Sequence, residues 1–293
     1  MAKERKTDLI QSIKEKGTTI EAEMSFFDHL EVLRWHLIRA AIAIIVFAGV
    51  AFTYSRVIYE KVLMGPKQPD FWTYRMLCLV GEKFNMGAEL CVKELPFTII
   101  NTSMGGQFML DMNSSLLIGI VFGIPYLLFE IWRFIKPGLK DIERKSASGF
   151  VFYTSMLFMI GLLFGYYVVT PLSINFLANY TISDDIVNSI TIDNYLSFMA
   201  TLTIGTALTF ELPIVIYILS RMGIMTPGFM RSSRRYATIL IFLIASIVTP
   251  GGDVLTMLTV SLPLFVLYEV SIIVSSRVEK RKKKVESDFY SGA

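Results

Sequence analysis

The sequence lacks the side chains and motifs on which most enzymes depend. Only two histidines occur, His29 and His36, and both precede the first long apolar run. A histidine-based nucleophilic triad or an HExxH zinc site within the apolar runs is therefore excluded. No GxSxG, Walker or GxGxxG pattern is present either. We expect no enzymatic activity, no metal and no cofactor, so any energy input comes from elsewhere, for instance from a membrane gradient.

Charged residues are also scarce, at 18% of the chain, whereas 53% of the residues are hydrophobic and the mean hydropathy is +0.54. These values indicate an all-α integral membrane protein with several spans. Runs of about 18 mostly uncharged residues predict membrane spans. Two shorter apolar runs that follow them are also candidate spans. Six candidates, of which the fifth and sixth are short, cover residues 37–54, 108–134, 149–170, 196–219, 236–249 and 255–275.

The fifth candidate is shorter than a bilayer is thick. Residues 236–249 would form a helix of about 21 Å at the α-helical rise, against a hydrocarbon core of ~30 Å. We expect the bilayer to thin beside this helix, or other parts of the protein to shield it.

The chain divides into a membrane domain and two polar ends. Residues 1–24 are polar and lack the apolar core of a cleavable signal peptide, so we expect the first span to act as its own insertion signal. Residues 25–37 have apolar side chains at helical spacing and predict an amphipathic helix that runs into the first span. The membrane domain covers residues 25–276, and residues 277–293 form a basic tail.

The distribution of Lys and Arg predicts that both termini are cytoplasmic. The outer loop 57–107 carries five basic residues that five acids match, and long loops weigh little in this rule. The basic tail suits the lipid headgroups of the bilayer, and we expect no nucleic-acid partner. Lys and Arg gather in residues 3–16, 133–145, 221–235 and 277–284, whereas residues 171–195 and 250–254 contain none.

Cys78 and Cys91, the two cysteines of the chain, both fall in the outer loop. A disulfide between them is favoured in an oxidising compartment. The alternative is two free thiols at an accidental spacing. No metal motif competes with the bridge.

Four acids lie in or near the predicted spans. Glu130 has Arg133 one helical turn later, which favours an ion pair. Asp253 lies in the turn TPGGD and is expected to stabilise that turn. Glu269 is close enough to the inner end of the sixth span to hydrogen-bond a neighbouring helix.

Glu211 is the fourth acid, and it lies near the middle of the fourth span. A carboxyl group against lipid costs several kcal/mol, so such a residue normally faces a cavity or a polar partner. Pro213 cannot donate a hydrogen bond to the carbonyl of Thr209, which predicts a bend beside the acid. A functional contact within the membrane and a plain interhelical hydrogen bond both remain open.

Five segments carry a resemblance to a known family when they are taken together. The pattern FxxPGL followed by ER, and the element FExP, are specific in combination. With these motifs the sequence resembles the TatC subunit of the twin-arginine protein translocase over about residues 25–276. The segments are SFFDHLEVLRWHL at 25–37, FEIWRFIKPGLKDIER at 129–144, TPLSINFLANY at 170–180, FELP at 210–213 and TPGGDVL at 249–255.

The resemblance implies a cup-shaped, six-span protein of the bacterial inner membrane with both termini inside. It implies a receptor that binds the twin-arginine signal peptides of folded precursors at the cytoplasmic face. The receptor then recruits single-span partners of the TatA and TatB type, uses the proton gradient, and assembles with other copies of itself.

The resemblance also assigns residues to signal-peptide binding. Glu143, followed by Arg144, matches the family glutamate that recognises the arginine pair, and carboxylates suit guanidinium groups. A second family glutamate belongs to the motif HLxELR, where this chain has Val32. The acid stands one residue earlier, at Glu31, which is ~100° around a helix; Arg34 completes the motif.

The outer loop and the fourth span also match the family pattern. Pro66 corresponds to a proline just outside the first span. Glu211, with Pro213, corresponds to an intramembrane glutamate that is expected to meet a partner helix or the inserted signal peptide.

Two other functions stay open from the sequence. Glu211 is suited to be the proton site of a proton-coupled small-molecule carrier, although the inverted repeats typical of such carriers are not evident. A purely structural scaffold is the other alternative.

Overall fold

The computed structural model describes residues 26–83, 91–92, 94–136, 149–183, 188–221, 223–249 and 254–291. These residues are almost entirely helical, as predicted. The elements are α2 (Phe26–Thr53), α3 (Ser55–Ile58), the π-helix η1 (Tyr59–Leu63), the 3-10 helix η2 (Gly65–Lys67), α4 (Trp72–Lys83), β1 (Thr98–Ile100), α5 (Gly106–Ile135), α7 (Phe150–Phe164), the π-helix η5 (Gly165–Val169), α8 (Thr170–Asn179), β2 (Ser189–Thr191), α9 (Ile192–Thr209), α10 (Leu212–Arg221), α11 (Pro227–Ser232), α12 (Arg234–Val248) and α13 (Val254–Ser291).

Five helical stretches in this part of the chain are long and apolar enough to cross a membrane, and they coincide with the first four predicted spans and the sixth. The helix α2 is continuous, so the predicted amphipathic helix and the first span join without a break. The third stretch comprises α7, η5 and α8. The five stretches are Leu30–Thr53, Gly106–Ile135, Val151–Asn179, Ile192–Ser220 and Thr256–Lys280.

The remaining predicted span corresponds to α12, which has 15 residues and is about 22 Å long. It packs against α13 and also contacts α9 and α11. The prediction of a short fifth span is therefore consistent with the structure.

The sixth predicted span, residues 255–275, lies within a longer helix. The helix α13 has 38 residues, and the part suited to the membrane runs over 25 of them, from Thr256 to Lys280. Hydropathy marks where the apolar run ends, at about Ser275. The helix continues because the charged residues that follow, mostly Lys, Arg and Glu, are themselves good helix formers.

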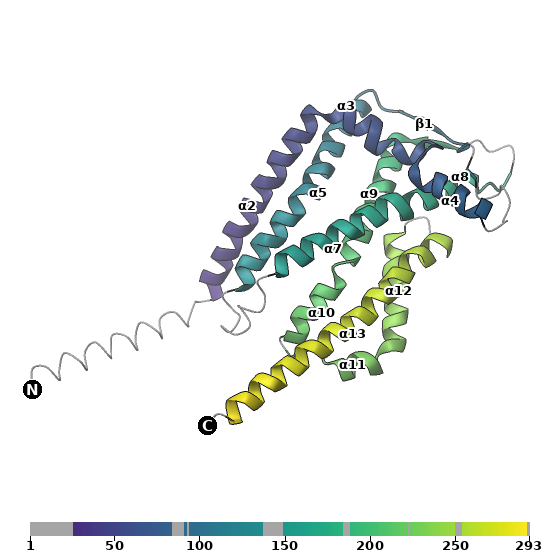
Figure 1. The fold of residues 1–293 in the computed structure, drawn as a ribbon. Coiled ribbons are helices and arrows are strands. Elements are labelled where there is room, and N and C mark those ends of the chain that lie inside the picture. The colour runs from purple at the N-terminus through teal and green to yellow at the C-terminus, as the bar shows by residue number, and fades with distance from the viewer. Residues whose placement is uncertain are drawn as a thin grey trace, which may run out of the picture.

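Figure 1 shows where the ends of the chain lie. The start of α2 and the end of α13 lie on the same side of the molecule, at the lower left of the view, whereas α3, α4 and β1 lie at the opposite end. This arrangement is consistent with the predicted topology, in which both termini are inside and the loop 57–107 is outside.

Close helix packing depends on small residues at the crossing points. A Cβ atom on Gly119 of α5 would lie 2.7 Å from the backbone nitrogen of Ala48 in α2, and one on Gly165 would lie 2.9 Å from the Cα atom of Thr203. Larger side chains there would push the helices apart. Small residues drive helix association in membranes because they allow backbones to approach.

The outer loop packs against the outer ends of the spans as a cap. Leu63 and Phe97 from the loop join Leu110, Ile174 and Leu196 from the spans in one buried cluster. The strands β1 and β2 pair in parallel, with Thr98 opposite Ser189. The described parts of the loop thus pack as part of the membrane domain.

Candidate polar sites in the membrane domain

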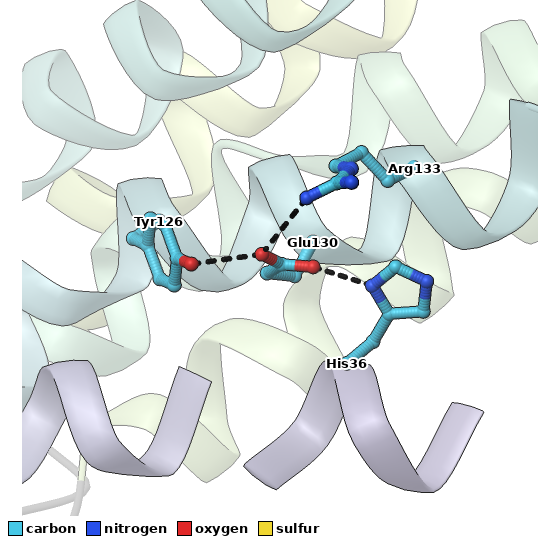
Figure 2. A network of polar contacts seen from close by, with 4 residues as sticks. All are labelled: His36, Tyr126, Glu130 and Arg133. Atoms are coloured by element: carbon cyan, nitrogen blue, oxygen red, sulfur yellow. Dashed lines mark hydrogen bonds and ion pairs between the residues drawn. The ribbon is translucent and has the colours of Figure 1, made fainter. Parts of the chain in front are cut away.

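Glu130 is the centre of a buried polar cluster between α2 and α5, near the end of α5 that is predicted to be cytoplasmic. Only 1% of its side chain is exposed. Three side chains surround the carboxylate in Figure 2: His36 contacts Oε2 through Nδ1, Tyr126 donates a hydrogen bond of 2.8 Å to Oε1, and an Arg133 nitrogen lies 3.6 Å from Oε1. The cluster therefore satisfies both carboxylate oxygens.

Helical spacing explains three members of this cluster. Tyr126, Glu130 and Arg133 occupy positions i−4, i and i+3 of α5, which share one face of a helix. The ion pair of Glu130 with Arg133 that the sequence predicted is confirmed. The Arg133 side chain is half exposed, however.

His36 and Tyr126 were not predicted to belong to this cluster. Tyr126 carried a detectable signal, because a tyrosine one turn before an acid on the same helix face can donate to it. His36 carried none, because 94 residues separate it from Glu130 and no periodicity in the sequence says which face of α2 meets α5.

Glu31 and Arg34, which were predicted to bind the signal peptide, lie on α2 just before His36. Both are exposed, whereas Val32 at the expected family position is half buried. Within the described part of the chain neither Glu31 nor Arg34 makes an ion pair. These two side chains are therefore available to a ligand at this end of the molecule.

Three predicted residues lie outside the described residues, so their predictions stay untested. Glu143 and Arg144 belong to the segment that follows α5, which ends at Ile135. Asp253 belongs to the segment between α12 and α13.

Glu211 lies where the fourth span breaks, as Pro213 predicted. The helix α9 ends at Thr209 and α10 begins at Leu212. The Oε1 atom of Glu211 is buried, and no hydrogen-bond partner for it is found among the described residues. The interhelical hydrogen bond that was the structural alternative is thus not seen for this oxygen. A buried oxygen without a partner is costly, which makes Glu211 a candidate functional residue.

The structure also resolves the remaining predictions on the outer side and in α13. Cys78 and Cys91 form a disulfide, which confirms the favoured alternative. Glu82 lies close enough to complete a metal-binding trio with the two sulfurs, but the sulfurs are bonded to each other. Glu269 accepts a 2.7 Å hydrogen bond from Arg234 of α12, so the predicted contact with a neighbouring helix is confirmed.

Pro66, the predicted structural residue outside the first span, is buried in η2. Its carbonyl oxygen lies 2.9 Å from the hydroxyl of Tyr74, which is also 3.0 Å from the carbonyl oxygen of Pro171. The hydroxyl therefore ties the loop to the start of α8.

Comparison with known proteins identifies the family. The family model described as "Sec-independent protein translocase protein (TatC)" matches residues 28–263. The chain belongs to the TatC family. It is therefore a subunit of a Sec-independent protein translocase, a multi-pass protein of the bacterial inner membrane and a transport component, not an enzyme.

Individual TatC proteins support this assignment over nearly their full length. The Sec-independent protein translocase protein TatC of Blattabacterium sp. is 33% identical over 261 residues, which cover 89% of this chain and 98% of that protein. The TatC protein of Aquifex aeolicus is 30% identical, with coverage of 90% and 99%.

Solved TatC structures share the fold. A crystal structure titled as the twin arginine translocase receptor TatC is 28% identical and superimposes with a TM-score of 0.64, covering 86% of this chain and 99% of that one. A second, in the detergent DDM, is 30% identical with a TM-score of 0.66, covering 84% of this chain and 99% of that one. The helical arrangement described above is thus the TatC fold.

Proposed function

We propose that this TatC-family chain is the receptor subunit that binds twin-arginine signal peptides of folded precursor proteins at the cytoplasmic face. The observation that carries the proposal is Glu31 at the start of α2, in a chain that belongs to the TatC family: its side chain is exposed and makes no ion pair with any other described residue. The titles of two similar structures name twin arginine translocase receptors, which supports the same role.

The chemistry of the ligand fits carboxylates. A guanidinium group offers a planar fork of donors that a carboxylate accepts in two parallel hydrogen bonds. Each of the two arginines can pair with one carboxylate. We assign these two carboxylates to Glu31 on α2 and to Glu143 on the segment after α5. Arg34 and Arg144 stand close to these acids in sequence, where they can orient the carboxylates.

The Glu130 cluster holds together the two helices that lead to this proposed site. His36 ties α2 to α5 one and a half turns after Glu31, so the start of α2 has a fixed position relative to the end of α5. Since the segment with Glu143 continues from α5, the same contact limits how far the two proposed arginine ligands can separate.

We assign Glu211 to docking within the bilayer. Its buried oxygen has no partner among the described residues, and a polar group on another transmembrane helix would satisfy it. The partners proposed are TatA- and TatB-type single-span proteins, recruited with the proton gradient, as well as other copies of this chain. The small-molecule carrier that Glu211 also allowed is not proposed, because the family is one of protein translocases.

An export assay tests the receptor role. Glu143→Ala and Glu31→Gln should each reduce export of a twin-arginine precursor while the level of the variant protein is maintained. Asp70→Asn is the matched control, because Asp70 is an exposed acid of the outer loop. Normal export in both Glu31 and Glu143 variants would reject the proposed arginine site.

A further inference from the structure

A cleft at the outer end of the spans has a charged mouth. The mouth is a cavity of about 710 Å³ between α3, η1, the start of α5 and the strand β1. Arg56 lies three residues beyond the end of α2, and Asp111 lies in the second turn of α5. These positions put the mouth at the level where the spans leave the hydrocarbon and where lipid headgroups of the outer leaflet lie.

The cleft continues into the membrane between α5 and α9. A second cavity of about 170 Å³ shares Leu110 and Ser114 with the first. Its deeper wall includes Leu117, Leu196 and Met199, and Leu117 is about 10 Å further along α5 than Leu110. The size of the mouth falls in the range of ~300–1,000 Å³ typical of ligand sites.

The charges in the mouth are not neutralised by one another. Lys67 is half buried with its ammonium 5.5 Å from the centre of the Phe97 ring, and Asp111 is half buried too. In the described ranges neither makes an ion pair, whereas Arg56 is already paired with Glu60 at 3.1 Å. A ligand that carries both an anion and a cation would complement this pair of charges.

We propose that this cleft binds one phospholipid of the outer leaflet whose headgroup carries a phosphate and a primary ammonium. The phosphate pairs with Lys67 and the ammonium donates hydrogen bonds to the carboxylate of Asp111. One acyl chain lies along Leu117, Leu196 and Met199. Two interactions favour binding of such a lipid: charge-assisted hydrogen bonds with the headgroup at the mouth, and apolar contact with the acyl chain deeper in the cleft.

The experiment measures lipid retention by native mass spectrometry of the full chain, purified in detergent and titrated with defined lipids. Phosphatidylethanolamine should be retained about tenfold more strongly than phosphatidylcholine, because a quaternary ammonium donates no hydrogen bond to Asp111. Asp111→Asn should abolish this preference. Lys67→Gln should weaken retention of both lipids, and Lys67→Arg should restore it.

Matched variants separate the cleft from the general surface. Lys61→Gln and Asp70→Asn make the same charge changes at exposed residues of the same loop that line neither cavity, so they should leave retention unchanged. The proposal is overturned if these controls lower retention as much as the cleft variants do.

Two further results would overturn the lipid as the occupant. Equal competition by O-phosphoethanolamine, which lacks acyl chains, would identify a soluble phosphorylated amine. A photo-crosslinking residue at position 117 that captures a polypeptide in cells, instead of lipid, would identify a protein segment. The expected result is a lipid adduct at position 117 and no competition by the headgroup alone.

Discussion

Replacing His36 by leucine should destabilise the protein more than any other single change in the Glu130 cluster. His36 is the only described partner of the Oε2 atom of Glu130, and the carboxylate is 1% exposed. Removing it leaves a buried charged oxygen unsatisfied, which costs about 3 kcal/mol. Arg133→Gln should cost about 1 kcal/mol or less, because the Arg133 side chain is half exposed and its nitrogen is 3.6 Å away.

The assay is reversible unfolding of the purified variants in detergent, arranged as a double-mutant cycle. Glu130→Leu combined with His36→Leu removes both polar partners and should recover part of the stability that His36→Leu loses alone. The reasoning is refuted if His36→Leu costs no more than Arg133→Gln, or if the two changes at His36 and Glu130 are simply additive.

Three more predictions concern other parts of the chain. Glu211→Gln should lower export of a twin-arginine precursor at an unchanged level of the protein; a purely structural scaffold would leave export intact. Reducing the disulfide of Cys78 and Cys91 removes the cross-link from a short loop, which stabilises by about 3 kcal/mol, and limited proteolysis should then cleave the outer loop faster. Burial raises the pKa of Tyr74 above its usual value of 10.0, so the neutral phenol is favoured in the folded cap. The cap should therefore keep this contribution at neutral pH and lose it as the pH rises past about 10. Burial also raises the pKa of Tyr59 in the same loop, so Tyr74→Phe should reduce the alkaline loss of stability in a pH-dependent unfolding series without removing it.

Hydropathy and charge were sufficient for most of the fold. The spans are long apolar runs, which can be read from the local sequence, and the positions of Lys and Arg predict an orientation with which the structure is consistent. The end of α13 was missed because the helix outlasts its apolar run: the charged residues after Ser275 favour a helix as much as the apolar ones do. Hydropathy indicates which residues are stable in the hydrocarbon of the membrane. The length of a helix also depends on the helix propensity of its residues.

The polar residues of the membrane domain could be predicted from the sequence only where they are close together in the chain or belong to a motif. The Glu130–Arg133 pair followed from i,i+3 spacing, and Glu211 stood out because its neighbours are apolar. The contact between His36 and Glu130 depends on how α2 packs against α5 through Gly119 and Gly123. That packing depends on which faces of the two helices meet. The residues near His36 or near Glu130 in the sequence do not show this.

The same limit applies to the cleft at the outer interface. Lys67 comes from η2 and Asp111 from α5, and the charge of each looks ordinary along the chain. They share one cleft because β1 pairs with β2 and holds the outer loop above the ends of α5 and α9. Tertiary packing of the cap, and not any motif, creates this site.

Site-specific crosslinking from α2 to a precursor tests the central claim most directly. A photo-reactive residue at position 31, and a second at position 143, should capture a precursor with an Arg-Arg signal peptide and lose that adduct when the pair is changed to Lys-Lys. A crosslinker at exposed Asp70 in the outer loop should not distinguish the two precursors. Equal capture of the Arg-Arg and Lys-Lys signals at positions 31 and 143 would contradict the account.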